Sequence, residues 1–348
     1  METWRIKMNL DVTRRQQRSR NRRVAQLLPL LFATWFALPT RAAGLDAQQV
    51  ELFALEMEHK HGFDATAVKN VLSLAVRLDS VLAAMARPAE SKSWAQYRPL
   101  FLSVERIRAG VEFWDTYAAA LDEASTQYGI PPEIIVAIIG VETFYGRNSG
   151  NYRVLDALGT LAFHFPARGA FFRSELEQFL LLTRAEQLDP VTPRGSYAGA
   201  MGFPQFMPSS FLSFAVDFDH DGHRDIWRNP VDAIGSVASY LHAHGWRLAE
   251  PIAMLAEPSN LNEKNASSKV ELNQTIAQYA SAGSSPQGTI APNEPAALLA
   301  YVGTEGNEYW FALNNFYVIT RYNHSPKYAL AVYQLAQAIR DMRMQKAQ

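Results

Sequence analysis

The feature that most constrains the fold is an apolar stretch in the middle of the chain. Residues 134–141 are isoleucine, valine, alanine and glycine, without a single polar side chain. Pro131 and Pro132 precede the stretch, where proline suits the first turn of a helix, and Gly146 follows it. A helix that is apolar on every face must be buried on most sides. The sequence therefore predicts a globular protein built around this helix.

Glu142 is the first ionisable residue after the apolar stretch. We expect apolar neighbours such as Phe144 to shield its carboxyl from water, which raises the pKa because desolvation disfavours the charged form. A carboxylic acid that keeps its proton near neutral pH can protonate a glycosidic oxygen. The alternative is a glutamate on an exposed last helical turn with no role, and spacing alone does not decide between the two.

The rest of the chain is predicted to be mainly helical. Apolar residues recur at helical spacing through residues 46–128. Further helices are predicted at 167–187 and 231–245, and an amphipathic helix at 326–342 closes the chain. A loop rich in glycine, proline and serine at 190–210 precedes the helix at 231–245.

One part of the chain departs from this helical character. Residues 257–295 are polar, with many asparagines, serines and glycines. Residues 296–313 predict a β-hairpin whose turn lies at 303–307, and residues 315–323 predict a further strand. The predicted fold class is therefore mainly α, or α+β, with a small antiparallel β-domain.

These boundaries predict five parts. They are a signal peptide at 1–43, a helical domain at 44–128, a core at 129–249 that contains an acidic loop at 217–232, a small β-domain at 250–320, and a C-terminal helix at 321–348 that returns to the helical part.

The first 43 residues have the pattern of an export signal. A basic stretch ends at Arg22-Arg23, apolar residues 24–38 follow, and small residues at Ala42-Ala43 suit a signal peptidase. The apolar run is shorter than the roughly 20 residues of a comfortable membrane span. We predict an exported, soluble protein of the periplasm, with an uncleaved membrane anchor or a buried core helix as the alternatives.

Composition excludes several kinds of chemistry. The 348 residues include no cysteine, which excludes thiol catalysis, cysteine-ligated zinc, a disulfide framework and lipid attachment at a signal-peptide cleavage site. The formal net charge of -1 argues against a nucleic-acid partner, because such proteins normally carry a basic face.

An acidic loop has the spacing of a calcium site. Asp217, Asp219 and Asp221 alternate, and Gly222 follows, as in the first half of an EF-hand loop. A hard cation needs several oxygens at once, and glycine permits the sharp bend that brings them together. The alternative is an acidic surface loop, in which three neighbouring carboxylates would repel each other without a cation.

The second half of the loop departs from the EF-hand pattern. His223 would supply its backbone carbonyl, but Arg228 occupies the position of the usual bidentate glutamate. A carboxylate from elsewhere has to replace it, and Asp232 at the start of the next helix is the candidate.

Four separated motifs, at residues 140–163, 196–210, 217–241 and 315–332, together resemble the lytic murein transglycosylase B family. The resemblance covers roughly residues 50–343. It implies a lysozyme-like helical core, an additional helical domain, a small β-domain and an EF-hand-like calcium loop. The cysteine that anchors many members to lipid is missing, which favours a soluble form.

The resemblance also assigns roles to individual residues. It implies that Glu142 is catalytic and that the calcium ion is structural, with no organic cofactor. The residues that it places against the saccharide are Ser196, Gln205, Tyr240, Tyr322, Asn323 and Tyr97, and the calcium ligands are Asp217, Asp219, Asp221, His223 through its carbonyl, and Asp232.

The activity implied is cleavage of the β-1,4 bond between N-acetylmuramic acid and N-acetylglucosamine in peptidoglycan glycan strands, with 1,6-anhydromuramoyl ends as products. Ordinary glycosidases use two carboxylates, and Asp156 and Glu175 lie in settings unlike that of Glu142. One carboxyl suffices when the sugar's own C6 hydroxyl attacks C1, because an intramolecular attack has a high effective concentration.

Two alternatives stay open from the sequence. One is a lysozyme-type muramidase that hydrolyses the same bond, and the other is a non-catalytic, calcium-dependent glycan-binding module. Other cell-wall enzymes are open as partners, and the sequence does not determine the oligomeric state.

Overall fold

The structure is a computed structural model that describes residues 44–86 and 92–346. The signal peptide predicted at 1–43 lies outside this part. Over the two described ranges, no helix combines the length and the apolar character that crossing a bilayer requires.

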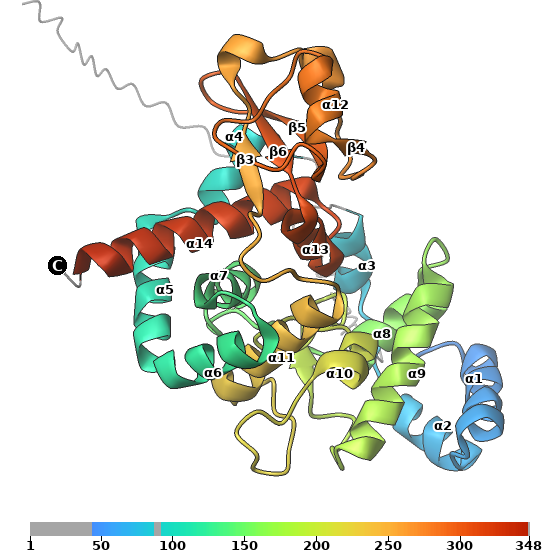
Figure 1. Cartoon of the computed structure of the whole chain (residues 1–348). Coiled ribbons are helices and arrows are strands. Elements are labelled where there is room, and N and C mark those ends of the chain that lie inside the picture. The colour runs from blue at the N-terminus through green and yellow to red at the C-terminus, as the bar shows by residue number, and fades with distance from the viewer. Residues whose placement is uncertain (1–43, 87–91, 347–348) are drawn as a thin grey trace, which may run out of the picture. The chain divides into compact units, whose positions relative to one another are not determined.

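The predicted apolar helix forms, and it is buried. Helix α7 (Pro132–Thr143) has proline in its first turn, and every residue from Ile134 to Val141 is buried. Its apolar faces are shielded from water because other helices pack against it on several sides (Figure 1). These helices are α5 (Val104–Thr116), α6 (Ala118–Tyr128), α11 (Pro230–Ala243) and α14 (Pro326–Lys346).

A second group of helices, α1, α2, α3, α8, α9 and α10, packs together in pairs. The helices α1 to α3 confirm part of the helical prediction for residues 46–128, and α9 confirms the helix predicted at 167–187. The side chains of Asp46 and Asp64 accept hydrogen bonds from the first turns of α1 and α2, which explains where these helices begin. The packed pairs are α1 (Ala47–His61) with α2 (Ala65–Ser73), α8 (Val154–His164) with α9 (Gly169–Ala185), α3 (Asp79–Met85) with α8, and α10 (Pro208–Phe214) with α9.

The predicted β-hairpin is confirmed, and it belongs to a four-stranded antiparallel sheet in the order β3-β6-β5-β4. The hairpin pairs Val302 with Asn307 at the turn. The helix α12 (Ile276–Ser281) packs beside the sheet, with Tyr279 against Phe311. The strands are β3 (Ala253–Leu255), β4 (Gln274–Thr275), β5 (Pro295–Val302) and β6 (Asn307–Ala312), and short 3₁₀ turns lie at Arg98–Leu100, Pro258–Asn260 and Glu263–Asn265.

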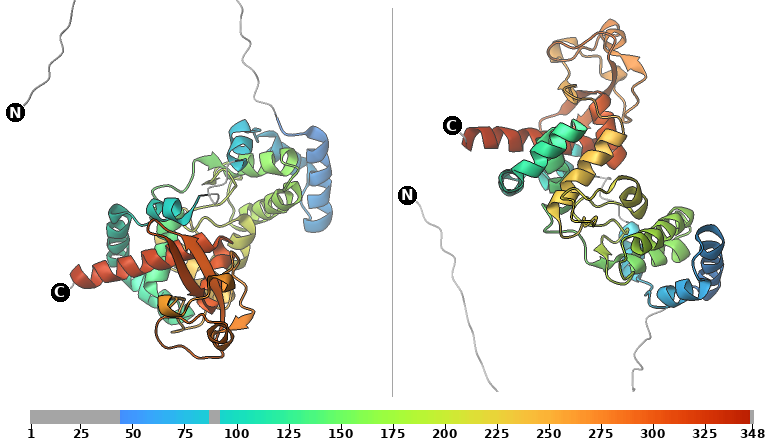
Figure 2. Two further views of the ribbon diagram at one scale, coloured as in Figure 1. Left: turned by 90° about the horizontal axis from the view of Figure 1, so that it is seen from above. Right: turned by 60° about the horizontal axis from the view of Figure 1, so that its bottom comes forward.

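The sheet is attached to α14. Figure 2 shows the strands crossing over this helix. The Tyr333 ring of α14 lies edge-on to Trp310 at 6.2 Å, and its hydroxyl donates to the Ala253 carbonyl at 3.3 Å. Tyr301 donates to the Pro326 carbonyl at 3.1 Å, so the sheet contacts the first turn of α14 as well.

The prediction of a strand at residues 315–323 is wrong, because this segment forms the helix α13 (Asn314–Tyr322). Its valine, isoleucine, threonine and aromatic residues favour strands in isolation. Packing against α14 overrides that propensity, because Phe316 and Ile319 lie one helical turn apart and are both fully buried. The mainly helical fold class with small antiparallel sheets is otherwise confirmed.

Asn315 fixes the start of α13 and gives a prediction on stability. Its buried amide donates to the carbonyls of Arg247 and Glu250, and its oxygen accepts from the Arg247 N–H at 2.8 Å. Replacing Asn315 by alanine leaves these backbone groups unsatisfied, and we expect a loss of about 2–3 kcal/mol in the free energy of unfolding. Urea denaturation measures it. The exposed Asn273, changed to alanine, is the control, and equal stability of the two variants would contradict the role.

Candidate active site

The carboxyl of Glu142 lies in the last turn of α7 and accepts a hydrogen bond from the Tyr328 hydroxyl at 2.6 Å. The residue keeps some solvent contact, but the protein packed around its carboxyl raises the pKa from 4.5 to about 7. Burial is the larger effect, because it disfavours the charged form, and the hydrogen bond from Tyr328 opposes it. Near neutral pH both protonation states are therefore populated, as acid/base chemistry requires.

Tyr328 was not singled out from the sequence. It lies 186 residues from Glu142, in the first turn of α14, and its 2% exposure is that of an ordinary core residue. Burial, with the Glu142 charge nearby, holds the pKa of the phenol well above its usual value. The hydroxyl therefore stays protonated and donates to the carboxyl. The only signal in the sequence is that Tyr328 falls inside the motif at 315–332.

The turn that follows α7 holds Glu142 in place. Phe144 and Tyr145 have left-handed backbone conformations, with φ of 51° and 60°, which is strained for residues other than glycine. Tyr145 is held by its hydroxyl, which donates to the Arg106 carbonyl at 3.0 Å. The Arg106 guanidinium stacks on the Phe144 ring at 4.6 Å and donates to the Gly140 carbonyl.

The loop predicted at 190–210 packs against this turn. Thr143 donates to the Phe203 carbonyl at 3.2 Å, and the Gln205 amide nitrogen donates to the Ser149 carbonyl at 3.0 Å. The Ser196 hydroxyl accepts from the Ala200 N–H at 3.1 Å, inside the loop. The short strand β1 (Tyr152–Arg153), which follows the turn after α7, pairs with the short strand β2 (Arg194–Gly195), which directly precedes Ser196. Gln205 and Ser196 therefore lie on the loop that contacts the Glu142 turn.

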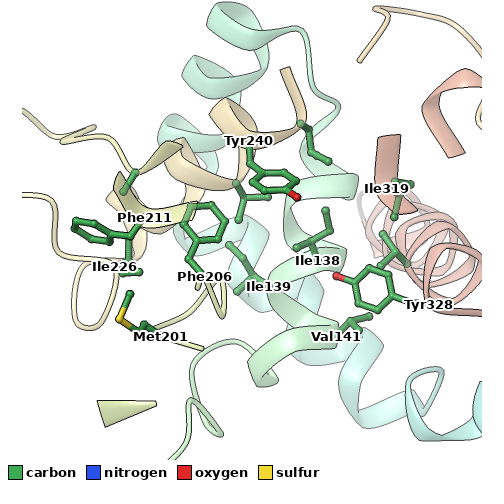
Figure 3. Close-up of a cluster of buried hydrophobic side chains, with 14 of the residues drawn as sticks. Ile138, Ile139, Val141, Met201, Phe206, Phe211, Ile226, Tyr240, Ile319 and Tyr328 are labelled. Carbon is green, nitrogen blue, oxygen red and sulfur yellow. The ribbon is translucent and has the colours of Figure 1, made fainter. Parts of the chain in front are cut away.

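Two of the predicted tyrosines, Tyr240 and Tyr322, lie in one aromatic cluster with Tyr328. The Tyr322 ring lies 4.7 Å from Tyr240 and stacks on Tyr328 at 6.5 Å. Their hydroxyls donate to backbone carbonyls, Tyr322 to Pro204 at 2.6 Å and Tyr240 to Arg321 at 2.5 Å. In Figure 3 the hydroxyls of Tyr240 and Tyr328 point toward each other across the end of α7. Burial raises the pKa of Tyr240 to about 12, so it too stays protonated.

The last two predicted saccharide residues have structural contacts of their own. Asn323 follows α13, and its side-chain oxygen accepts from the Ser325 N–H at 3.1 Å in the turn that leads to α14. Tyr97 lies in the short helix α4 (Trp94–Tyr97), is 3% exposed, and packs against Phe101 at 5.0 Å. The Lys327 ammonium lies 5.9 Å from its ring, which places Tyr97 beside the start of α14.

Neither of the other two carboxylates considered from the sequence contacts Glu142. Asp156 is buried and accepts two hydrogen bonds from Arg153, each of 2.7 Å. Glu175 is buried and accepts from the N–H and the hydroxyl of Ser209, at 3.0 and 2.7 Å, in the first turn of α10. Both carboxylates are engaged in holding the fold.

The acidic loop brings three of the predicted calcium ligands together. One carboxylate oxygen from each of Asp217, Asp219 and Asp221 lies within 4.8 Å of the others. Gly222 has φ of 95° and donates its N–H to Asp217 at 2.9 Å, so the sharp bend forms as expected. These three convergent carboxylates fit a hard cation that takes oxygen ligands.

Asp232 lies at the start of α11, outside that group of three. It is fully buried, and its two oxygens accept from the N–H groups of Phe218 and Asp225, each at 2.8 Å. Burial raises the pKa of its carboxyl. The Asp232 side chain therefore holds the loop at two places, Phe218 and Asp225. The N–H of His223 donates to Asp221 at 2.9 Å.

A carboxylic acid whose pKa is raised by burial is the kind of group that glycan-cleaving enzymes use as a general acid. The family model described as Transglycosylase SLT domain matches residues 46–337, and the chain belongs to this family. It is a lytic transglycosylase, an enzyme that cleaves peptidoglycan without hydrolysis.

Individual relatives agree with this family. The chain is 48% identical over 311 residues to membrane-bound lytic murein transglycosylase B of Escherichia coli (strain K12), covering 86% of this chain and 84% of the relative. The E. coli lytic transglycosylase Slt35 in complex with calcium is 47% identical with a TM-score of 0.79, over 85% of this chain and 93% of that one. Pseudomonas aeruginosa SltB3 in complex with NAG-NAM-pentapeptide is 30% identical with a TM-score of 0.75, over 84% and 79%.

Removing the Tyr328 hydroxyl tests its effect on Glu142. Because the hydrogen bond favours the ionised carboxyl, Tyr328→Phe should raise the pKa of Glu142 further, by about one unit. The alkaline limb of the pH-activity profile should move to higher pH by the same amount. Tyr333→Phe, which removes another hydroxyl from α14, is the control. An alkaline limb that stays in place in Tyr328→Phe would show that the hydrogen bond does not tune this carboxyl.

Proposed function

We propose that Glu142 is the single acid/base group that cleaves the β-1,4 bond between N-acetylmuramic acid and N-acetylglucosamine and forms 1,6-anhydromuramoyl ends. The observation that carries this proposal is a largely enclosed carboxyl with a pKa of about 7, held by one hydrogen bond from a tyrosine. Such a group can donate a proton and take one back at the same pH.

The proposed reaction needs one carboxyl and no water. Protonated Glu142 donates its proton to the bridging oxygen as the bond from that oxygen to C1 breaks. The carboxylate then accepts the proton of the C6 hydroxyl on the same muramoyl sugar, and that oxygen bonds to C1. Glu142 ends protonated, as it began. Asp156 is hydrogen-bonded to Arg153 and Glu175 to Ser209, which supports a mechanism without a second carboxylate.

Tyr328 supports both steps from one position. Its hydroxyl stabilises the ionised form of Glu142 after the first proton transfer and limits how far burial raises the pKa. We propose that Tyr240, Tyr322 and Asn323 form the part of the site beside the reacting sugar, because their contacts join α11, α13 and α14 around the end of α7.

The loop at 196–206 supplies the remaining saccharide contacts in this proposal. The Gln205 amide oxygen accepts no hydrogen bond from any residue that the structure describes, so it can accept from a sugar hydroxyl or acetamide. Ser196 keeps a donor hydrogen, because its oxygen serves the loop only as an acceptor. Tyr97 would lie at the other side of α14, beside Lys327.

Glu142→Gln tests the catalytic assignment. The amide has the shape of the carboxyl but no transferable proton, so we expect cleavage of isolated sacculi to fall by at least about a thousandfold. Mass spectrometry of the products of the unchanged protein should show anhydro ends, which are lighter by one water than hydrolytic ends. Turnover of the variant within a few-fold of the unchanged protein would rule out the assignment.

The same variant has a predicted effect on stability with a definite sign. Burial penalises ionised Glu142, so the unchanged protein loses stability relative to Glu142→Gln as the pH rises from 4.5 to about 7. The difference should reach at most about 3 kcal/mol above that range and vanish below it. Thermal melts between pH 4 and 8 measure the trend, and a difference that does not change with pH would contradict the raised pKa.

We also propose that the acidic loop binds one structural calcium ion. Asp217, Asp219 and Asp221 would hold it, the His223 carbonyl would be a further ligand, and Asp232 would support the loop through the backbone bonds that it accepts. The ion would neutralise the repulsion among the three carboxylates. The calcium complex of Slt35 supports this proposal.

Chelation tests the calcium proposal. Removing divalent cations should lower the melting temperature, and calcium should restore it; affinity on the order of 10⁻⁴ to 10⁻³ M is typical of extracellular sites. Asp219→Ala should abolish the response to calcium, and Asp122→Ala, at an exposed aspartate of α6, should keep it. A melting temperature that ignores both chelator and calcium would refute the site.

The export signal predicted at residues 1–43 supports the periplasm as the place where this enzyme meets peptidoglycan. We propose this location, together with the division into a helical domain, a lysozyme-like core, a small β-domain and a returning C-terminal helix. Other cell-wall enzymes are the partners that this location suggests.

A further inference from the structure

A short segment at residues 225–229, which we call the linking segment, joins the acidic carboxylates to the start of α11. It contacts the loop at 194–206 that holds the proposed saccharide residues, which we call the saccharide loop. The carbonyl of the fully buried Ile226 accepts from the Phe203 N–H at 2.9 Å. A Cβ atom at Gly202 would lie 2.3 Å from the same carbonyl oxygen, so only glycine lets the two segments approach this closely.

Trp227 makes a second contact between the two segments. Its indole N–H donates to the Arg194 carbonyl at 3.1 Å, at the start of the saccharide loop, and its ring packs on Phe211 of α10 at 5.6 Å. Figure 3 shows Ile226 in one cluster with Phe211 and with Met201 of the saccharide loop. The linking segment is therefore bonded to this loop at two points, and neither Ile226 nor Trp227 has a role in the proposed reaction.

The saccharide loop is bonded in turn to the segment that follows Glu142. The Phe203 carbonyl accepts from the Thr143 hydroxyl at 3.2 Å, and Thr143 is the residue after Glu142. The Phe203 ring lies against Gly146, where a Cβ atom would be 2.2 Å from it. Phe203 is therefore held on one side by the linking segment and on the other side by the turn after α7.

Both ends of the linking segment are bonded to carboxylates of the acidic loop. The Asp225 N–H donates to Asp232 at 2.8 Å, and the Asn229 side-chain amide donates to Asp219 at 2.8 Å. The Asn229 N–H also donates to the Asp225 carbonyl at 3.1 Å, which closes the segment into a turn. Asp219 is one of the three proposed calcium ligands, so a change in the position of its carboxylate acts directly on the linking segment.

The position of Asp219 depends on the charges around it. Its carboxylate has an oxygen within 4.8 Å of those of Asp217 and Asp221, and the three charges repel each other unless a cation neutralises them. The later part of the loop is held independently, because the Arg224 guanidinium donates to Glu186 at the end of α9 at 2.9 Å. Removing the cation should therefore loosen Asp219 and the linking segment without unfolding the rest of the loop.

We propose that calcium at the acidic loop strengthens glycan binding, because Ile226 and Trp227 transmit its ordering effect to the saccharide loop. Both are positioning residues, since they act on the substrate only through this loop. The inference rests on the proposed calcium site and saccharide contacts, and it goes beyond a structural role of the ion by making substrate affinity depend on it. Because coupling between two sites is reciprocal, the glycan should raise the affinity for calcium by the same factor.

Equilibrium binding tests this coupling without turnover. Glu142→Gln, which should bind glycan without cleaving it, is titrated with oligosaccharides of N-acetylglucosamine and N-acetylmuramic acid, in calcium and in chelator. We expect the Kd to be about fivefold higher in chelator, at the lower end of typical coupling between sites. Hydrogen exchange at the Phe203 N–H, which Ile226 holds, should be faster in chelator. In the unchanged protein, chelator should raise KM about fivefold and leave kcat within about twofold.

Trp227→Phe tests the route. The variant keeps an aromatic ring beside Phe211 but loses the indole N–H, so calcium should change the glycan Kd by less than about twofold, while the melting temperature still rises with calcium. Trp246→Phe is the matched control, because the buried indole N–H of Trp246 has no partner among the residues that the structure describes. This control should keep the full effect of calcium on the Kd.

The outcomes separate the coupling from the proposed function. A glycan Kd that ignores calcium while the melting temperature responds to it would overturn the coupling alone, and this comparison decides even if Trp227→Phe does not fold. Transmission through Trp227 is overturned if Trp227→Phe keeps the full effect of calcium, or if Trp246→Phe loses it as well. A melting temperature that ignores calcium would refute the metal site and the coupling together, whereas anhydro ends formed by Glu142→Gln would refute only the catalytic assignment.

Discussion

The hydrogen bond between Tyr328 and Glu142 links the two helices on which the rest of the molecule depends. It joins the end of α7 to the start of α14, across 186 residues of sequence. α7 is buried because α5, α6, α11 and α14 surround it, and that same burial gives its terminal carboxyl a pKa of about 7. The packing that stabilises the core therefore also sets the pKa of this carboxyl. A looser core around α7 would admit water and return Glu142 to the pKa of an ordinary glutamate.

Around this contact, left-handed backbone conformations and side-chain hydrogen bonds determine the positions of the turn after α7 and of the neighbouring loop. The left-handed conformations of Phe144 and Tyr145 end α7 at Thr143, the residue after Glu142, and the Arg106 guanidinium stacks on the Phe144 ring. The neighbouring loop is attached through Thr143 and Gln205. Tyr322 and Tyr240 donate to carbonyls from two other elements, which orients their rings. Each of these side chains is therefore held by a specific partner in the candidate site.

α14 connects the candidate active site with the small sheet. Its first turn carries Tyr328, which donates to Glu142, and Pro326, whose carbonyl accepts from Tyr301 of the sheet. The sheet is fastened to the same helix through Tyr301, Trp310 and Tyr333.

Much of this protein could be predicted from its sequence. The apolar run before Glu142 determined a buried helix, and the spacing of Asp217, Asp219, Asp221 and Gly222 determined a loop with convergent carboxylates. These are local properties, set by composition and periodicity within one segment. Tertiary structure alone decided the helix at 314–322, where packing on α14 overrode strand propensity, and the pairing of Tyr328 with Glu142. Contacts between distant segments depend on how the helices pack, and no local pattern records that packing.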